Sequence, residues 1–149
     1  MSPEECHARY EISLEMYITK IAIESRIIGE LALTHVVPTA YKYQSVLIEN
    51  MRGLKDLLGD SYKKMCKNQL LAVKTISDHI TTVQTYVAKM EIEVEKANKL
   101  ADPLKQAKAY ADKVKPNFDA IRGGLDALET IVDDQDWPLP KYRELLFIK

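Results

Sequence analysis

The sequence has few glycines, few cysteines and almost no net charge, and each shortage excludes a class of protein. Only 5 of the 149 residues are glycine, while Ala, Leu, Glu and Lys recur at helical spacing, which predicts an all-α protein. The formal net charge is −1, so no strong field attracts nucleic acid or an anionic membrane. The nearest basic run, Lys63-Lys64 with Lys67, has no interleaved aromatic platform and is interpreted as a solvated helix face.

The cysteines and the apolar segments indicate a reducing, aqueous environment. Cys6 and Cys66 have no paired spacing, so a disulfide remains open, but two free thiols in a reducing cytosol fit better. Residues 1–5 lack the basic region and apolar core of a signal peptide. The apolar run at residues 18–37 contains four charged residues, so it is not a membrane span. We therefore expect a single soluble, cytoplasmic domain over residues 1–149.

The first predicted helix covers residues 3–58 and is kinked or broken at Pro38. The opening Ser2-Pro3-Glu4-Glu5 supplies a hydroxyl N-cap, a proline at the first helical position and a carboxylate at the third. Pro38 removes one helical hydrogen bond and clashes with the preceding turn, although helical spacing resumes directly after it. Gly59 is a candidate C-terminal residue, and a tight turn at residues 59–61 is expected to follow.

Two further helices are predicted, over residues 61–101 and 103–132. In both, apolar residues alternate at spacings of three and four, which is typical of coiled-coil-like packing. The alternation continues unchanged across Pro116, so we predict one helix kinked near Pro116 rather than two helices. Gly123-Gly124 costs about 1 kcal/mol per glycine relative to alanine in a helix interior. Close approach of a neighbouring backbone and a flexible turn both remain open as reasons for this pair.

These helices predict an antiparallel three-helix bundle of long, kinked, coiled-coil-like helices, because two tight turns join three long rods. If the first helix continues through Pro38 it is longer than the others, so its amino-terminal turns would project beyond the bundle. Between Ile18 and Val37 apolar residues exceed the narrow stripe that a surface helix needs. A helix with more than one apolar side needs more than one packing partner.

Residues 133–149 form a proline-rich C-terminal tail that contains the only tryptophan of the chain. Pro138-Leu139-Pro140 favours an extended turn, and the tail ends on an apolar segment of Leu, Phe and Ile. Chain ends of this composition are normally docked onto another surface. We expect the tail to fold back onto the bundle or onto a neighbouring subunit.

Candidate chemical sites are few. Glu4 and His7 have the Glu-x-x-His spacing of di-iron helices, but the required second copy is absent from the sequence. The carboxylates of Asp133, Asp134 and Asp136 would suit Mg²⁺, although an acidic loop is more often simply solvated. His35 and His79 have no nucleophile arranged near them and are interpreted as helix-surface or bundle-edge residues. We therefore assign no catalytic, cofactor-binding or metal-binding residue to this chain.

The tail nevertheless resembles a known family. Residues 132–147, with the string Trp137-Pro138-Leu139-Pro140-Lys141-Tyr142-Arg143, are similar to the closing segment of type III glutamine synthetases. The resemblance extends over nearly the whole chain and includes Ala8-Arg9-Tyr10-Glu11-Ile12, Ile23-Glu24-Ser25-Arg26 and Tyr110-Ala111-Asp112-Lys113-Val114-Lys115-Pro116. This resemblance implies a C-terminal helical domain whose catalytic portion lies upstream.

The resemblance implies a parent enzyme that makes glutamine from glutamate and ammonia with ATP and Mg²⁺, as a large ring-shaped homo-oligomer in nitrogen metabolism. None of that family's nucleotide, metal or glutamate ligands matches this sequence, so the chain alone is predicted to be inactive and to need no cofactor of its own. Its expected role is packing and oligomer assembly against the catalytic portion and neighbouring subunits. The predicted interface residues are Ile23, Ile27, Leu31, Trp137, Tyr142, Leu146 and Phe147.

Two other functions remain open from the sequence. A free-standing coiled-coil module for protein–protein interaction would use the same apolar surfaces and would begin its reading frame at Met1. A small metal- or ligand-binding bundle would instead be stabilised against heat by ATP-Mg²⁺ or by a transition metal.

Overall fold

The structure is a computed structural model that describes residues 3–141 and residue 144. All the regular structure in this part of the chain is helical, which confirms the prediction of an all-α protein. Among the same residues, no helix is both long and apolar enough to cross a membrane. Both cysteines are free: Cys6 is exposed and Cys66 is buried.

The first rod is one uninterrupted helical segment in three parts. It consists of α1 (Pro3–Glu30), the π-helical η1 (Leu31–Val36) and α2 (Val37–Leu58). The N–H of Val37, the residue before Pro38, donates to the carbonyl of Ala32, five residues back. This wider turn accommodates a proline that would otherwise collide with the carbonyl four residues before it. The chain therefore passes Pro38 without leaving the helix.

The turn after the first rod is longer than the sequence predicted. The 3₁₀ turn η2 (Gly59–Ser61) leads into the short α3 (Tyr62–Met65), and the long helix α4 (Lys67–Asn98) begins only after Cys66. Gly59 has a φ of 55°, a backbone conformation that favours glycine. The long helix thus begins six residues after the predicted Ser61, because the buried Cys66 ends α3 and reorients the chain.

The third rod is also continuous through its proline. It comprises α5 (Pro103–Ala109), the π-helical η3 (Tyr110–Val114) and α6 (Pro116–Ile131). The side chain of Asp102 caps its start by accepting from the backbone N–H of Leu104, at 2.9 Å, and of Lys105. The N–H of Lys115 donates to the carbonyl of Tyr110, five residues back. Both rod-interior prolines are therefore preceded by a π-helical turn.

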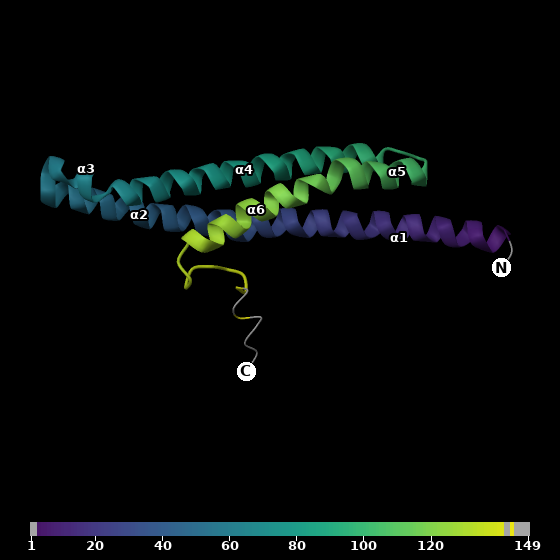
Figure 1. The fold of residues 1–149 in the computed structure, drawn as a ribbon, viewed down its shortest axis with the longest axis horizontal. Helices are drawn as coiled ribbons and strands as arrows, with labels where there is room; N and C mark the ends of the chain where they lie inside the picture. The colour runs from purple at the N-terminus through teal and green to yellow at the C-terminus, as the bar shows by residue number, and fades with distance from the viewer. Residues whose placement is uncertain (1–2, 142–143, 145–149) are drawn as a thin grey trace.

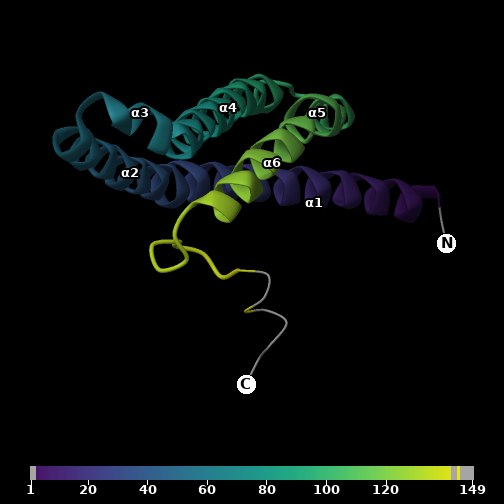
Figure 2. The same ribbon diagram turned by 60° about the vertical axis from the view of Figure 1, so that its left-hand side comes forward.

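The three rods lie side by side, and the chain reverses direction between them (Figure 1). α4 packs along α6 and α2, while α1 contacts α5 and the π-helical turn of the third rod. Figure 2 shows the third rod crossing the first near its middle. The amino-terminal end of α1 extends beyond the other rods, and residues 3–13 are all exposed.

The core follows the apolar positions predicted from the three-four alternation. On α4 the buried residues are Ile76, Ile80, Val83, Val87, Met90 and Ala97, and on the third rod they include Val114, Phe118, Ile121 and Leu128. Of the two adjacent glycines only Gly124 is buried, and a Cβ added there would lie 2.6 Å from the Val83 side chain. A neighbouring helix thus approaches Gly124 closely, whereas no described atom of another helix lies within 4 Å of a Cβ built at Gly123.

Candidate interaction surfaces

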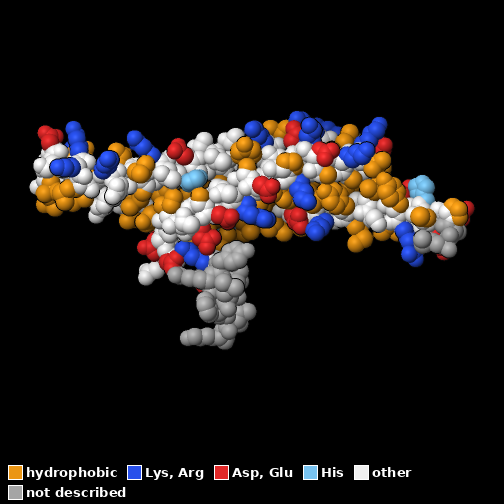
Figure 3. Space-filling view, in the orientation of Figure 1, with side chains coloured by type: hydrophobic (Ala, Val, Ile, Leu, Met, Phe, Trp, Pro, Cys, Tyr) orange, Lys and Arg blue, Asp and Glu red, His pale blue; other side chains and the backbone are white. Residues whose placement is uncertain are grey.

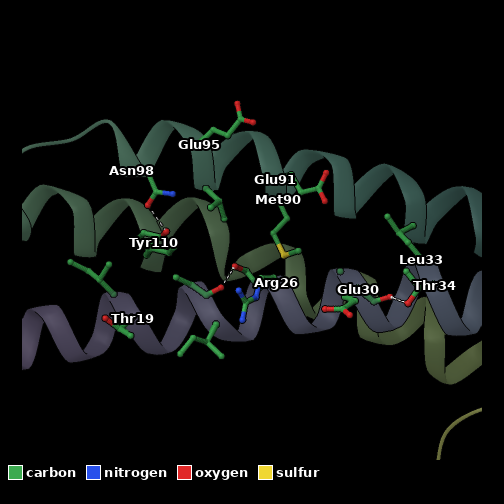
Figure 4. Close-up of a pocket in the computed structure, with 16 residues that line it drawn as sticks. Thr19, Arg26, Glu30, Leu33, Thr34, Met90, Glu91, Glu95, Asn98 and Tyr110 are labelled. Atoms are coloured by element: carbon green, nitrogen blue, oxygen red, sulfur yellow. Dashed lines mark hydrogen bonds between the residues drawn. The ribbon is translucent and has the colours of Figure 1, made fainter.

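A groove of about 790 Å³ runs between α1 and α4, with the third rod beneath it (Figure 4). Its apolar lining includes Ile18, Ala22, Met90 and Val94, which are also part of the core or packed against it. Gly29 lines the groove on α1. A Cβ added to it would make ordinary contacts with Val87 and Met90, at 3.5 and 3.6 Å. The groove is therefore a shallow apolar surface between two helices.

Tyr110 of the π-helical turn η3 forms part of this groove and carries its main polar contact. The side chain is fully buried, and its hydroxyl donates to the Asn98 Oδ1 atom at 2.8 Å (Figure 4). Burial raises the pKa of Tyr110 above its ordinary value, and the side-chain hydrogen bond between Tyr110 and Asn98 partly offsets that increase. The phenol therefore stays neutral at physiological pH and serves as a hydrogen-bond donor that fixes Asn98.

Charged residues stand around the groove. Arg26 and Glu30 come from α1, and Glu91 and Glu95 from α4 (Figure 4). No group of three or more metal-binding side chains exists among the described residues. This arrangement can hold an apolar segment within a polar rim.

A second apolar side of α1 faces away from the core. Ile12, Met16, Ile23 and Ile27 are 55%, 68%, 46% and 46% exposed, at spacings of four, seven and four residues. These spacings place the four side chains on one side of a helix, whereas the buried Ile21 lies two residues, or about 200°, away from Ile23. Figure 3 shows hydrophobic side chains gathered along α1. We call these four residues the outer stripe of α1.

The predicted interface residues on the first rod fall on or beside this stripe. Ile23 and Ile27 belong to it, and Leu31 is half-buried at the start of η1. Ile23 also lines the groove between α1 and α4. The surplus of apolar residues in this part of the sequence therefore corresponds to side chains that the described structure leaves exposed.

A smaller groove, of about 430 Å³, lies at the turn between the first rod and α4. We call residues 48–71 the hairpin tip. Ile48, Met51 and Leu70 line the groove, with Lys55 and Lys63 among its polar residues. Other apolar side chains of the tip face solvent, including Leu57, which is 84% exposed.

The described part of the C-terminal tail packs against the third rod. Trp137 and Leu139 are half-buried against the core, and Asp136 forms an ion pair with Lys42 of α2. Lys141 pairs with Asp134 and donates to the Glu129 carbonyl at 3.2 Å. The buried indole N–H of Trp137 has no hydrogen-bond partner among the described residues. The remaining predicted tail residues, Tyr142, Leu146 and Phe147, lie outside the described residues.

The acidic residues and histidines that were candidates for a chemical site make only local contacts or lie apart from one another. Asp133 accepts from the backbone N–H of Gln135 at 2.8 Å, while Asp134 and Asp136 pair with lysines, so these carboxylates brace the start of the tail. His7 lies 3.5 Å from Glu11 on the exposed end of α1. His35 is exposed and His79 half-buried, on different rods.

The sequence interpretation missed Tyr110, the largest fully buried side chain of the described residues. The three-four alternation over residues 103–132 predicts Ala111 as the core residue between Ala107 and Val114, although Tyr110 fits the same spacing. The spacing of Tyr110 from these two residues, three and four positions, was the available signal. The choice between the two depends on the π-helical winding of η3.

Comparison with known proteins gives similarities over the whole chain. The family described as "Glutamine synthetase C-terminal domain" matches residues 1–55. A glutamine synthetase of Bacteroides fragilis is 39% identical over 146 residues, which are 97% of this chain and 20% of that protein. The type-3 glutamine synthetase of Dictyostelium discoideum is 28% identical over 159 aligned positions, covering 100% of this chain and 20% of that protein. The chain thus spans about one-fifth of the length of these relatives.

Proposed function

Because the chain corresponds to the C-terminal domain of the glutamine synthetase family, we propose that it is a non-catalytic packing and assembly module of such an enzyme. The parent enzyme would be a cytoplasmic ligase that joins ammonia to glutamate, with ATP and Mg²⁺ bound in the catalytic portion. This chain would contribute no ligand to that reaction. Its partners would be the catalytic portion of the same enzyme and the neighbouring subunits.

One observation carries the proposal: α1 has apolar side chains on two opposite sides. Ile21 faces the core, whereas Ile23 and Ile27 lie outside it with almost half of their surface exposed. Two such residues one turn apart on a long helix form a continuous apolar surface. In a relative five times as long, the catalytic portion is the natural cover for this surface.

The tail supports the same role. Trp137 is packed against the core, yet its buried indole N–H lacks a partner among the described residues. Buried donors are normally satisfied, which favours a further contact at this position. Tyr142, Leu146 and Phe147 would supply apolar contacts of the same interface. The antiparallel, coiled-coil-like bundle predicted from the sequence would be the rigid frame that holds α1 and the tail in place.

The proposal can be tested in a chimera that carries residues 1–149 in place of the matching fifth of the Bacteroides fragilis enzyme. Substituting Ile23→Glu and Ile27→Glu buries two carboxylates if the catalytic portion covers these two positions. Each lost apolar anchor contributes about 2 kcal/mol to such an interface. We expect smaller oligomers in light scattering and a loss of glutamine formation.

Ile92→Glu is the matched control, because Ile92 is 52% exposed on α4 and lies outside the outer stripe. This variant should keep the oligomer and its activity. If Ile23→Glu with Ile27→Glu behaves like the control, the surface at Ile23 and Ile27 is not an assembly surface and the proposal fails.

The free-standing coiled-coil alternative makes a different prediction for the isolated chain. There the Ile23→Glu and Ile27→Glu substitutions would abolish self-association, since the outer stripe would be the contact between copies. Under our proposal these two residues face water in the isolated chain, so the substitutions leave its association state unchanged. Sedimentation velocity of the isolated variant separates the two.

A further inference from the structure

The two ends of the molecule carry exposed apolar residues that the contact at Ile23 and Ile27 does not use. One end is the projecting amino-terminal part of α1, and the other is the hairpin tip (Figure 1). Ile12 and Met16 are exposed at the first end, and Leu57 and Leu70 at the second. The rods separate these ends, so the two surfaces of one copy cannot meet each other.

The hairpin tip combines an apolar groove with positive charge. Its 24 residues, 48–71, contain five Lys or Arg residues and three Asp or Glu residues. Arg52 is already paired with Glu49 at 2.8 Å. Lys55 and Lys63, which line the groove beside Met51, have no ion-pair partner among the described residues.

The projecting end of α1 has the complementary character. Residues 3–18 contain four glutamates and one arginine. Ile12 and Met16 lie one turn apart on the exposed side, and Glu15 lies beside them in a shallow hollow of the same surface. Glu11, one residue before Ile12, contacts only His7 of its own helix among the described residues, at 3.5 Å. This end is therefore an acidic amphipathic helix.

We propose that the amino-terminal end of α1 of one copy docks into the hairpin-tip groove of a second copy, a contact that deepens and rests on the assembly function proposed above. Ile12 and Met16 enter the groove beside Met51 and Leu70. Glu11 and Glu15 face Lys55 and Lys63 of the second copy. The contact joins different surfaces of identical chains, so it continues from copy to copy and closes into a ring when the rotation permits.

Charge favours this arrangement over the symmetric ones. Two hairpin tips facing each other would bring Lys55 and Lys63 against the same residues of the other copy. Two α1 ends facing each other would likewise bring Glu11 and Glu15 of one copy against the same glutamates of the other. Like charges at an interface oppose association, and opposite charges raise its rate and fix its register.

Sedimentation velocity of the 149-residue chain over a range of concentrations tests the proposal first. The native chain should associate reversibly, with a dissociation constant that rises about tenfold when salt is increased from low to high ionic strength. Lys55→Glu with Lys63→Glu should weaken association by at least about tenfold. Lys108→Glu with Lys113→Glu changes the same charge on exposed sites of the third rod and should have no effect.

A reciprocal swap identifies the two surfaces. Glu11→Lys with Glu15→Lys should also prevent self-association, and one chain carrying all four substitutions should regain it. An equimolar mixture of the two double variants should associate although each variant alone does not, because the α1 end of each variant carries the charge opposite to the hairpin tip of the other. Circular dichroism of each variant confirms that the helices are intact.

The proposal is overturned if the native chain stays monomeric at millimolar concentration, if the mixture stays monomeric, or if the fourfold variant fails to associate. The same charge variants in the Bacteroides chimera separate this contact from the general assembly role. Loss of oligomer with Ile23→Glu and Ile27→Glu, but not with Lys55→Glu and Lys63→Glu, would leave the proposed function standing and remove the head-to-tail contact.

Discussion

Replacing Gly124 by alanine would introduce a methyl group into the contact between α6 and α4. A Cβ built at Gly124 lies 2.6 Å from Val83 Cγ2, closer than nonbonded carbon atoms approach in folded proteins. Val83 is fully buried on α4, and a valine in a helix has essentially one rotamer. The side chain therefore cannot turn away, and the two helices must separate to admit the methyl group.

The expected change in stability combines two effects. Alanine in a helix interior is about 1 kcal/mol more favourable than glycine. Overpacking a well-filled core costs typically about 1–3 kcal/mol, and the fixed rotamer of Val83 places this site near the upper end. Gly124→Ala should therefore lower the free energy of unfolding by about 1–2 kcal/mol.

The adjacent glycine provides the control. Gly123 is exposed on the same helix, and no described atom of another helix lies within 4 Å of its added Cβ. Gly123→Ala should therefore raise the free energy of unfolding by about 1 kcal/mol. A third variant, Val83→Ala with Gly124→Ala, removes the clashing methyl group and should be at least as stable as Val83→Ala alone.

Urea denaturation followed by helical circular dichroism measures these differences. With a slope of about 2 kcal/mol per molar urea, the two alanine variants should differ in midpoint by about 1 M or more. Equal midpoints for Gly123→Ala and Gly124→Ala would refute the close packing of α6 on α4 at this position. So would a Val83→Ala/Gly124→Ala variant that is less stable than Val83→Ala.

Two further predictions concern the start of the third rod and the buried tyrosine. Asp102→Ala removes the side chain that accepts hydrogen bonds from the Leu104 and Lys105 N–H groups. This variant should lower the free energy of unfolding, measured by urea denaturation, by about 1 kcal/mol. Asp102→Asn should retain most of that stability, because asparagine is also a good N-cap. The pKa of Tyr110 is raised in the folded state, so the stability that it contributes is complete below pH ~10 and falls as the pH rises further. Tyr110→Phe removes the titrating group, so above pH ~10 the urea midpoint of this variant should fall less than that of the native chain. An equal fall of the two midpoints would contradict the burial of Tyr110.

The apolar alternation was sufficient to predict which side of each long helix faces the core. Ile76, Ile80, Val83 and Val87 of α4 are all buried, because a spacing of three and four residues keeps side chains on one face of a helix. The same argument identified the surplus of apolar residues around Ile23 on α1. Local pattern suffices in these cases because helical geometry is the same in every protein.

The sequence could not decide how the chain passes its prolines or where α4 begins. Pro38 and Pro116 both follow π-helical turns, and each of these turns contacts another rod. The same winding turned Tyr110 into the core. Cys66 is buried where α3 ends, and this burial depends on contacts across the hairpin tip that no local pattern encodes.

By itself the sequence determined an all-α chain, the core-facing residues of its rods, and a resemblance to the C-terminal region of glutamine synthetases. Those properties depend on periodicity and on residue strings, which can be read locally. The tertiary structure decided which apolar residues stay exposed, which glycine is pressed against Val83, and which charges lie beside the hairpin-tip groove. These depend on how three rods lie against one another, because exposure is a property of the packed molecule and not of any single helix.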